Sequence, residues 1–563
     1  MKTISELPAI VRDAYQRDTL GVAFLSDLFT DGVPVKGDDT LLIVVLDPPT
    51  HATAVRARFT RDASGRGGGG NGNGHPFKPV AQFEGGEHTA IGNSVTLSFP
   101  GTGALPAATA PLTLANNLQL TYGQIVALAG DFYGVPANPI SSGTTFAQQQ
   151  QFFLAAFNTL NNDPTTQAAQ ILGVMQTEIN AVRQAMLNGE QSSSAYEVLG
   201  DTLSAQWNKI TGGGSFVTPW YPLGRYLQLA AVNFDHFSQD AVTSYTAGHA
   251  AALAQAVVAS QQSGAAQIAA LQMAYAMNAF ADHFLSDLFS SGHMRTPRRQ
   301  LYDSVTPSDL GSLLSREMHD EDSLFGLIVT SVNGGVTWRA YGDKRYADTV
   351  DQGNAGLVDD AVQTSASEVF QAFSSGQAIP PPNFAALQMM ANLAGVQQYG
   401  ASLTTNTSPM FAPSGTTVAV RNTLNNLNDY SWTTFWIGSK TYLALRTSYD
   451  PALPTGDMPV PVSGPTISSW QQQTASPPNW VGSNAVRYAV SFTNFGFWES
   501  DPGPWSPWVT IQNEAFPSLA GVPTDPTGIA AGRNVWRQFT NSNPTFVGAI
   551  NDNTTTTFTD IKN

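Results

Sequence analysis

The stretch AAQIAALQMAYAMNAFADHFLSDLFSSGH, residues 265–293, is apolar at most positions and is interrupted by ionisable residues only near its end. A helix that is apolar all round is buried in a protein core. We therefore expect residues 265–289 to form the central helix of a helical bundle. Asp282, His283 and Asp287 would then lie in apolar surroundings, where an unpaired ionisable group is strongly unfavourable. These three side chains need partners inside the fold.

The spacing of these residues suggests a metal site. His283 and Asp287 are four residues apart, so both project from one face of a helix and can bind the same ion. His293 follows Gly292, where the helix can end and the chain turn back toward the same cavity. A buried hydrogen-bonded pair is the alternative for His283 and Asp287. The apolar surroundings favour a metal, because a cation would supply the missing partner.

Composition limits the possible partners and ligands. The chain has 563 residues, which at roughly 100–200 residues per domain predicts two to four domains. Charged residues make up only 12% and the net charge is −16. Nucleic-acid binders usually display basic patches, so we expect no nucleic-acid partner. There is no cysteine, so any metal must be held by His, Asp and Glu.

Export is expected because charged residues are few and uncharged polar residues are abundant, a composition found in many secreted proteins. Residues 1–28 carry scattered charges and lack the apolar run of a cleaved signal peptide. No stretch approaches the roughly 18 apolar residues that a membrane helix needs. We predict a secreted, extracellular bacterial protein without a recognisable signal peptide.

The chain divides into four segments by pattern. Residues 1–115 predict a β-rich flank of the catalytic unit, with a strand at 41–46 and a glycine-rich surface loop at 65–74. Residues 116–450 are mainly helical, residues 451–463 form a proline-rich linker, and residues 464–563 alternate like β-strands. The helices are expected at 122–130, 146–187, 195–210, 226–261, 265–289, 356–373, 383–393 and 439–446. A hairpin is expected at 327–330 and 336–341, joined by Asn-Gly-Gly.

The C-terminal segment resembles a known β fold. The likeness rests on RYAVSF from Arg487, GPWSPW from Gly503, RNVWR from Arg533 and TTTTFTD from Thr554. Together these runs are similar to a fibronectin type III-like sandwich, which implies an all-β C-terminal domain. We expect this domain to bind a membrane, a glycan or another protein.

The histidine pattern resembles a known enzyme family. His283, Asp287 and His293 form H-x3-D-x5-H, and His236 lies 47 residues upstream of His283. This pattern is similar to zinc-dependent phospholipase C and its relative nuclease P1. The longer string HFLSDLFSSGHMRTPR, which ends at Arg298, is closer still to the phosphatidylcholine-hydrolysing branch of Pseudomonas fluorescens and Legionella. The resemblance covers roughly residues 80–345 and implies a helical bundle that holds two to three zinc ions.

The resemblance implies a ligand set, residue by residue. Asp131 matches an aspartate that bridges metals or activates water, so it is also the candidate catalytic base. The family pattern H-x3-E pairs a histidine with a glutamate four residues later, but the residue four after His319 is Ser323. The carboxylate ligand that accompanies His319 is therefore either Asp322, which we prefer, or Glu321. For His88, an ordinary surface histidine is the alternative. The implied ligands are His88, Asp131, His236, His283, Asp287, His293, His319 and Asp322.

Further residues are candidates for substrate binding. Arg295 and Arg298, with Arg299 beside them, are expected either to contact phosphate or to cap helix carbonyls. His249 falls on the same predicted helix as His236 and is expected to support a ligand or to line a lipid pocket.

The implied function is hydrolysis of phosphatidylcholine-type phospholipids at a membrane surface, giving diacylglycerol and a phosphorylated headgroup. Closely spaced zinc ions would polarise phosphoryl oxygens and activate water. A P1-type nuclease or nucleotidase shares such a site and is one alternative. A non-catalytic surface protein is the other.

Overall fold

The computed structural model describes residues 40–46, 52–58 and, with interruptions, 85–561. The longer interruptions are 188–194, 196–201, 214–219, 397–405, 449–458 and 473–484. The predicted glycine-rich loop at 65–74 and most of the predicted linker lie outside the described residues.

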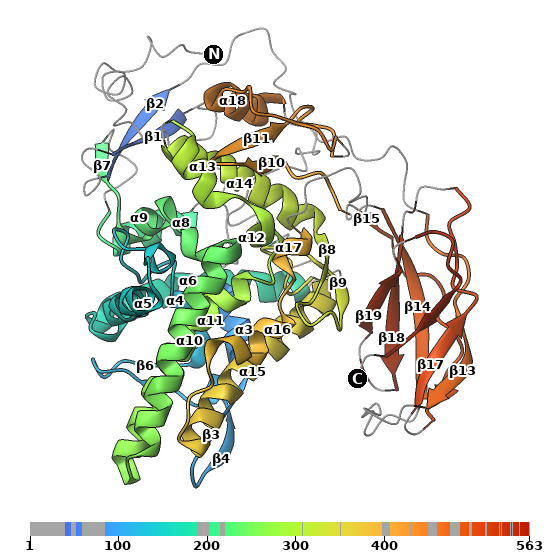
Figure 1. The fold of residues 1–563 in the computed structure, drawn as a ribbon, viewed down its shortest axis with the longest axis horizontal. Coiled ribbons are helices and arrows are strands. Elements are labelled where there is room, and N and C mark those ends of the chain that lie inside the picture. The colour runs from blue at the N-terminus through green and yellow to red at the C-terminus, as the bar shows by residue number, and fades with distance from the viewer. Residues whose placement is uncertain are drawn as a thin grey trace.

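The described chain is mainly helical, as predicted, and it contains fifteen α-helices among its described residues. Its centre is the antiparallel pair α10 (Ser238–Ser260) and α11 (Gly264–Asp287), which runs through the helical part in Figure 1. Every residue of α11 from Ala274 onward is buried, in agreement with its apolar sequence. Helices α4 (Tyr122–Leu128) and α15 (Gln352–Ser375) pack against α11.

The remaining helices make up the rest of the helical part (Figure 1). They are α3 (Gly85–Ser94), α5 (Phe146–Asn161), α6 (Thr165–Leu187), α8 (Thr202–Ile210), α9 (Arg225–Ala231), α12 (Ser291–Arg295), α13 (Arg298–Ser304), α14 (Ser308–Phe325), α16 (Ala385–Met389), α17 (Leu393–Val396) and α18 (Gly438–Ser448).

Two predicted helices are broken in the structure. The helix expected at 146–187 divides into α5 and α6 near Pro164, because proline cannot donate the helical hydrogen bond. The helix expected at 226–261 divides into α9, the 3-10 turn η4 (Phe234–His236) and α10. Ser238 begins α10 with φ +48°, a backbone conformation that interrupts a continuous helix. His236 and His249 therefore lie on different elements, contrary to the prediction.

Small antiparallel sheets flank the helices. The predicted strand at 41–46 is β1 (Thr40–Leu46), and it pairs with β2 (Ala52–Arg58), which pairs with β7 (Trp220–Pro222). The predicted hairpin is also present, as β8 (Leu327–Thr330) and β9 (Thr337–Ala340). The other small strands are β3 (Thr96–Phe99), β4 (Gly103–Pro106), β5 (Leu112–Thr113), β6 (Gln119–Leu120), β10 (Phe411–Ser414), β11 (Thr417–Arg421) and β12 (Trp432–Thr433).

The C-terminal part contains two antiparallel sheets, visible at the right of Figure 1. One has the order β13-β17-β20 and the other β15-β14-β18-β19, with β16 also paired to β14. Their strands are β13 (Thr466–Gln472), β14 (Ala485–Asn494), β15 (Trp498–Glu499), β16 (Val509–Thr510), β17 (Ala515–Ala520), β18 (Gly532–Phe539), β19 (Thr545–Ile550) and β20 (Thr557–Thr559). Side chains from both sheets share one hydrophobic cluster, so the sheets face each other.

The second of these sheets also packs on the helical part. Trp536 and Phe546 belong to the large hydrophobic core that includes α11 and α15. A Cβ added at Gly353, on α15, would approach the Phe546 ring. Among the described helices, none is long and apolar enough to cross a bilayer.

Candidate metal centre

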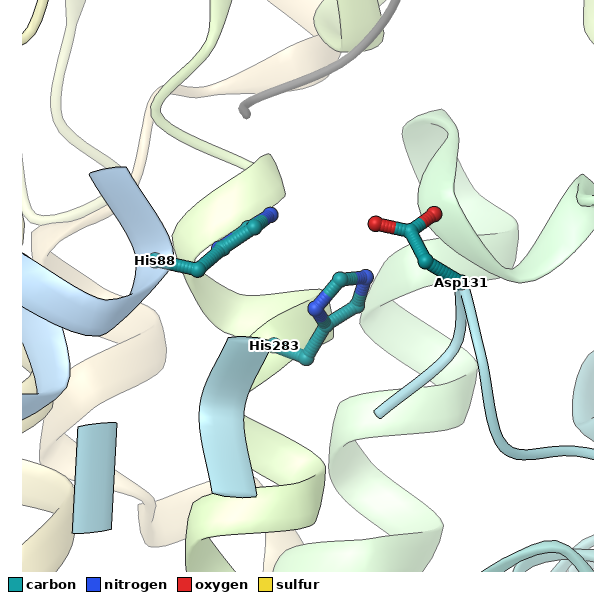
Figure 2. A group of neighbouring side chains, drawn as sticks. All are labelled: His88, Asp131 and His283. Carbon is teal, nitrogen blue, oxygen red and sulfur yellow. The ribbon is translucent and has the colours of Figure 1, made fainter. Parts of the chain in front are cut away.

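A group of His and Asp side chains meets at the C-terminal end of α11. His88 from α3, His283 from α11 and Asp131 from the loop after α4 have donor atoms that all lie within 4.8 Å of one another. Figure 2 shows the two rings and the carboxylate facing a common space. Both histidines are buried, whereas Asp131 is half-buried. These three residues form the first triad.

Asp287 joins the first triad to a second one, made of His236, His283 and Asp287. Its Oδ2 lies 2.9 Å from Nδ1 of His236 and 3.7 Å from Nε2 of His283. Its Oδ1 lies 3.6 Å from Nε2 of His88. One carboxylate therefore contacts three histidines, and His283 belongs to both triads.

A third triad contains His293, His319 and Asp343. The Asp343 carboxylate lies 3.8 Å from Nε2 of His293 and 3.0 Å from Nε2 of His319. His293 is on α12 and His319 is on α14, and these helices cross closely at Gly292. A Cβ at Gly292 would collide with Ser323 and with the His319 ring, so the approach of the two histidines requires glycine there.

Hydrogen bonds at the far nitrogen orient four of the rings. In each case Nδ1 is bonded to an oxygen, which leaves Nε2 facing the cluster. The four contacts are His88 to Ser286 Oγ (3.0 Å), His283 to the Val126 carbonyl (2.9 Å), His293 to the His236 carbonyl (2.8 Å) and His319 to Asp320 Oδ1 (2.9 Å). Histidines that bind metals typically donate their other N–H to a carbonyl or carboxylate in this way.

Several buried polar atoms of the three triads make no hydrogen bond, which indicates whether a metal ion could bind between them. Among the described residues, Oδ2 of Asp287, Nε2 of His293, Nε2 of His319 and Oδ2 of Asp343 are buried and make no hydrogen bond of good geometry. Their nearest polar neighbours are the ionisable groups of their own triads, at 2.9–3.8 Å. Buried polar atoms without partners are costly. Zinc bonds of about 2.0–2.1 Å place tetrahedral ligands roughly 3.3 Å apart, similar to the separations here. These buried donors could therefore hold a metal ion with bonds of this length.

Electrostatics favour the ligand forms of three histidines. Burial lowers the pKa of His88, His236 and His283 well below the ordinary value, and neighbouring imidazoles lower it further. A neutral imidazole is the form that binds a metal. These rings need no proton loss before binding.

Two other groups hold protons that a metal would displace. Burial raises the pKa of Asp287 to about 8, and the nearby Asp343 carboxylate adds to this. Burial disfavours the charged form of His319, but Asp343 and Asp320 outweigh it and raise the pKa of His319 to about 10. Burial would raise the pKa of Asp343, but His319 and His293 hold it well below its usual range. His319 and Asp343 form an ion pair in the metal-free protein.

We expect zinc loading at pH 7 to release about two protons in total, one from His319 and most of one from Asp287. Zinc affinity should therefore rise with pH up to about pH 8, where Asp287 loses its proton, and more gradually up to about pH 10. Calorimetry in buffers of different ionisation enthalpy measures this release. A binding enthalpy that does not depend on the buffer would contradict the expectation.

Asp322 is not in the cluster, so the preferred partner of His319 is corrected. Its two carboxylate oxygens accept hydrogen bonds from Arg295 at 2.6 and 2.8 Å, and it is completely buried. The reserve choice, Glu321, pairs with Arg421 at 2.7 Å. Asp343 takes the place beside His319. It follows the predicted hairpin, and its separation in sequence from the histidines left no local spacing to reveal it.

The arginines expected to contact phosphate instead donate hydrogen bonds to other groups of the protein. Arg295 also donates to Thr407, so it serves the fold together with Asp322. Arg298 donates to Asn233 and to the carbonyls of Ala230 and Ala231, near the C-terminal end of α9. Of the two expected roles, Arg298 therefore has the one of capping helix carbonyls.

Arg299 and His249 lie away from the three triads. Arg299 pairs with Asp240 at 2.9 Å, and both side chains are half-buried. His249 contacts Asn278 through Nδ1 and Glu368 through Nε2, inside the core between α10, α11 and α15. It belongs to no metal group among the described residues.

Gly130 is a residue of the site that the sequence analysis did not identify. Its φ is +68°, a conformation that side chains rarely adopt, and an added Cβ would lie 2.7 Å from Nε2 of His283 and 2.8 Å from Cε1 of His236. The turn before Asp131 can therefore pass against both rings only with glycine. Its position directly before Asp131 was the available signal.

We expect Gly130→Ala to weaken zinc binding by at least tenfold and to destabilise the protein by about 1–3 kcal/mol. Gly101→Ala is the matched control, since Gly101 has φ +83° but an added Cβ meets nothing within 4 Å. Chelator competition and thermal unfolding measure the two effects. Equal zinc affinity in both variants would contradict the steric argument.

Comparison with protein families found no matching family, and comparison with curated proteins found no matching sequence.

Proposed function

We propose that the protein is a zinc-dependent phospholipase C that hydrolyses phosphatidylcholine-type phospholipids to diacylglycerol and a phosphorylated headgroup. The observation that carries the proposal is the union of three His/Asp triads, in which His283 is shared and Asp287 contacts three histidines. Adjacent sites of this kind suit two or three zinc ions. Multinuclear centres are a common arrangement for phosphoryl transfer to water.

Eight residues would hold the ions: His88, Asp131, His236, His283, Asp287, His293, His319 and Asp343. Bound zinc would offset the negative charge that develops on the phosphoryl oxygens and would make water a stronger nucleophile. Asp131 is the only half-buried member of the set, so its carboxylate is the best placed to meet water. We assign to it the removal of a proton from the attacking water. Asp287 is fully buried and has a positioning role.

The finer fold assignments are part of the same proposal. We infer a phospholipase C/nuclease P1-like bundle for the helical part and a fibronectin type III-like sandwich for the C-terminal sheets. The order β15-β14-β18-β19, facing a smaller sheet, supports the second. We expect the protein to be secreted and to act at phospholipid membranes, with membrane, glycan or protein as the ligand of the C-terminal part.

The test compares substrates with and without a chelator. We expect release of phosphocholine and diacylglycerol from phosphatidylcholine vesicles, loss of this activity with chelator, and recovery when zinc is restored. Single-stranded DNA and 3′-nucleotides are the comparison substrates for a P1-type nuclease. Faster hydrolysis of these than of vesicles would replace the proposed substrate. Absence of chelator-sensitive hydrolysis of any of them would reject the enzymatic function.

A further inference from the structure

The residue before His88 makes a long-range contact that the proposed chemistry does not use. Glu87 lies on α3 and is 4% exposed. Its two carboxylate oxygens accept hydrogen bonds from the backbone N–H of Lys344 (2.9 Å) and of Tyr346 (3.1 Å). Hydrogen bonds to a charged carboxylate are about twice as strong as neutral ones. Glu87 therefore attaches α3 firmly to the loop that follows β9.

This loop carries Asp343, the carboxylate of the third triad. Lys344 has φ +70°, an unfavourable conformation for a residue with a side chain, so its backbone has to be held by neighbouring contacts. On the other side of the loop, Ser290 Oγ donates to Asp343 Oδ1 at 2.7 Å. The Gly342 N–H donates to the Ser323 carbonyl at 3.1 Å. Immediately after Asp343, the Arg345 N–H closes a turn with the Gly342 carbonyl at 3.2 Å, and Glu87 supplies two further hydrogen bonds that tie this turn to α3.

We infer that Glu87 is a positioning residue for Asp343, and that it links α3, which carries His88 of the first triad, to the loop of the third triad. Adjacent residues of one helix serve both triads, because His88 belongs to the first and Glu87 holds the loop of the third. This inference rests on the proposed metal centre. If it holds, the position of α3 affects the geometry and the zinc affinity of the site formed by His293, His319 and Asp343.

Glu87→Gln is the informative change, because it conserves size and burial. Glutamine has a single acceptor oxygen, so one backbone N–H of the loop would face its NH2 group instead. We expect the affinity for zinc of the third triad to fall by roughly 10- to 100-fold, the usual effect of losing a residue that supports ligands. The first two triads should keep their zinc.

Glu368→Gln is the matched control. Glu368 is also 4% exposed and accepts a backbone hydrogen bond, from Ala385, but it lies with His249 away from the metal groups. Zinc affinity is measured with a competing chromophoric chelator, and site geometry by the visible absorption of the Co²⁺-substituted protein. Thermal unfolding in chelator shows whether both variants fold.

The expected result is a weakened class of zinc sites and an altered Co²⁺ spectrum in Glu87→Gln, with neither change in Glu368→Gln. Wild-type affinity and spectrum in Glu87→Gln would overturn the inference, as would equal changes in both variants. If Glu87→Gln does not fold, Glu87→Asp keeps the charge with a shorter reach, and the same outcomes apply. Failure of the wild-type protein to bind zinc would instead reject the proposed metal centre.

Discussion

His283→Ala is expected to lower phospholipid hydrolysis by roughly a thousandfold or more and to remove at least one zinc ion per chain. His283 is the residue shared by the first two triads, so its loss leaves both incomplete. A metal ion contributes several kcal/mol of charge stabilisation in the transition state, and about 4 kcal/mol corresponds to a thousandfold in rate. Phosphocholine release and zinc content, measured on the same preparation, test both effects.

His249→Gln is the control for loss of a buried imidazole. His249 is as buried as His283, but its polar contacts are with Asn278, Glu368 and Ser365 in the core. We expect this variant to be less stable and to keep its zinc. Full zinc content and wild-type activity in His283→Ala would contradict the assignment of the shared ligand.

Asp131→Asn is expected to lower turnover by about 10²- to 10⁴-fold, the usual contribution of a general base. Asparagine keeps the shape and one ligand oxygen but cannot take a proton from water, so most of the zinc should remain bound. The measurements are turnover under saturating lipid and zinc content.

Asp163→Asn is the matched change for Asp131→Asn. Asp163 is also half-buried and accepts a hydrogen bond from Tyr133, but it belongs to none of the metal groups found among the described residues. It should leave turnover near the wild-type value. Parallel loss of zinc and turnover in Asp131→Asn would make Asp131 a ligand without a proton-transfer role, and an unchanged turnover would remove it from the mechanism.

The centre of the fold could be predicted because its signal is local. The apolar run at 265–289 and the four-residue spacing of His283 and Asp287 are both properties of one helix, and α11 is present almost as predicted. The resemblance to a known family added His88, Asp131, His236 and His319. The structure brings these residues together with His283, Asp287 and His293 in adjoining groups.

The elements that the sequence analysis missed carry weak local signals. Helix α3 contains three glycines and has little amphipathic pattern, so His88 was placed in a β-rich flank. Helix α14 is rich in charged residues in its second half, and two of these, Glu321 and Asp322, are buried and paired with the distant Arg421 and Arg295. Such pairs exist only after folding, and a spacing rule for helices cannot detect them.

Asp343 illustrates the same difficulty for the site. The family pattern directed attention to positions 321–323, next to His319. The structure pairs Asp322 with Arg295 and Glu321 with Arg421, and brings Asp343 to His319 from the loop after β9. A ligand supplied by tertiary contact, with no fixed spacing from the other ligands, cannot be recognised in a single sequence.

Counting the zinc ions tests the central claim most directly. Elemental analysis of the full chain, after dialysis against zinc and removal of weakly bound metal, should give two to three zinc ions per chain. His283→Ala should give at least one fewer, while His249→Gln should give the wild-type number. Less than one zinc ion per folded wild-type chain, or the same number in His283→Ala, would contradict a multinuclear zinc centre at the end of α11.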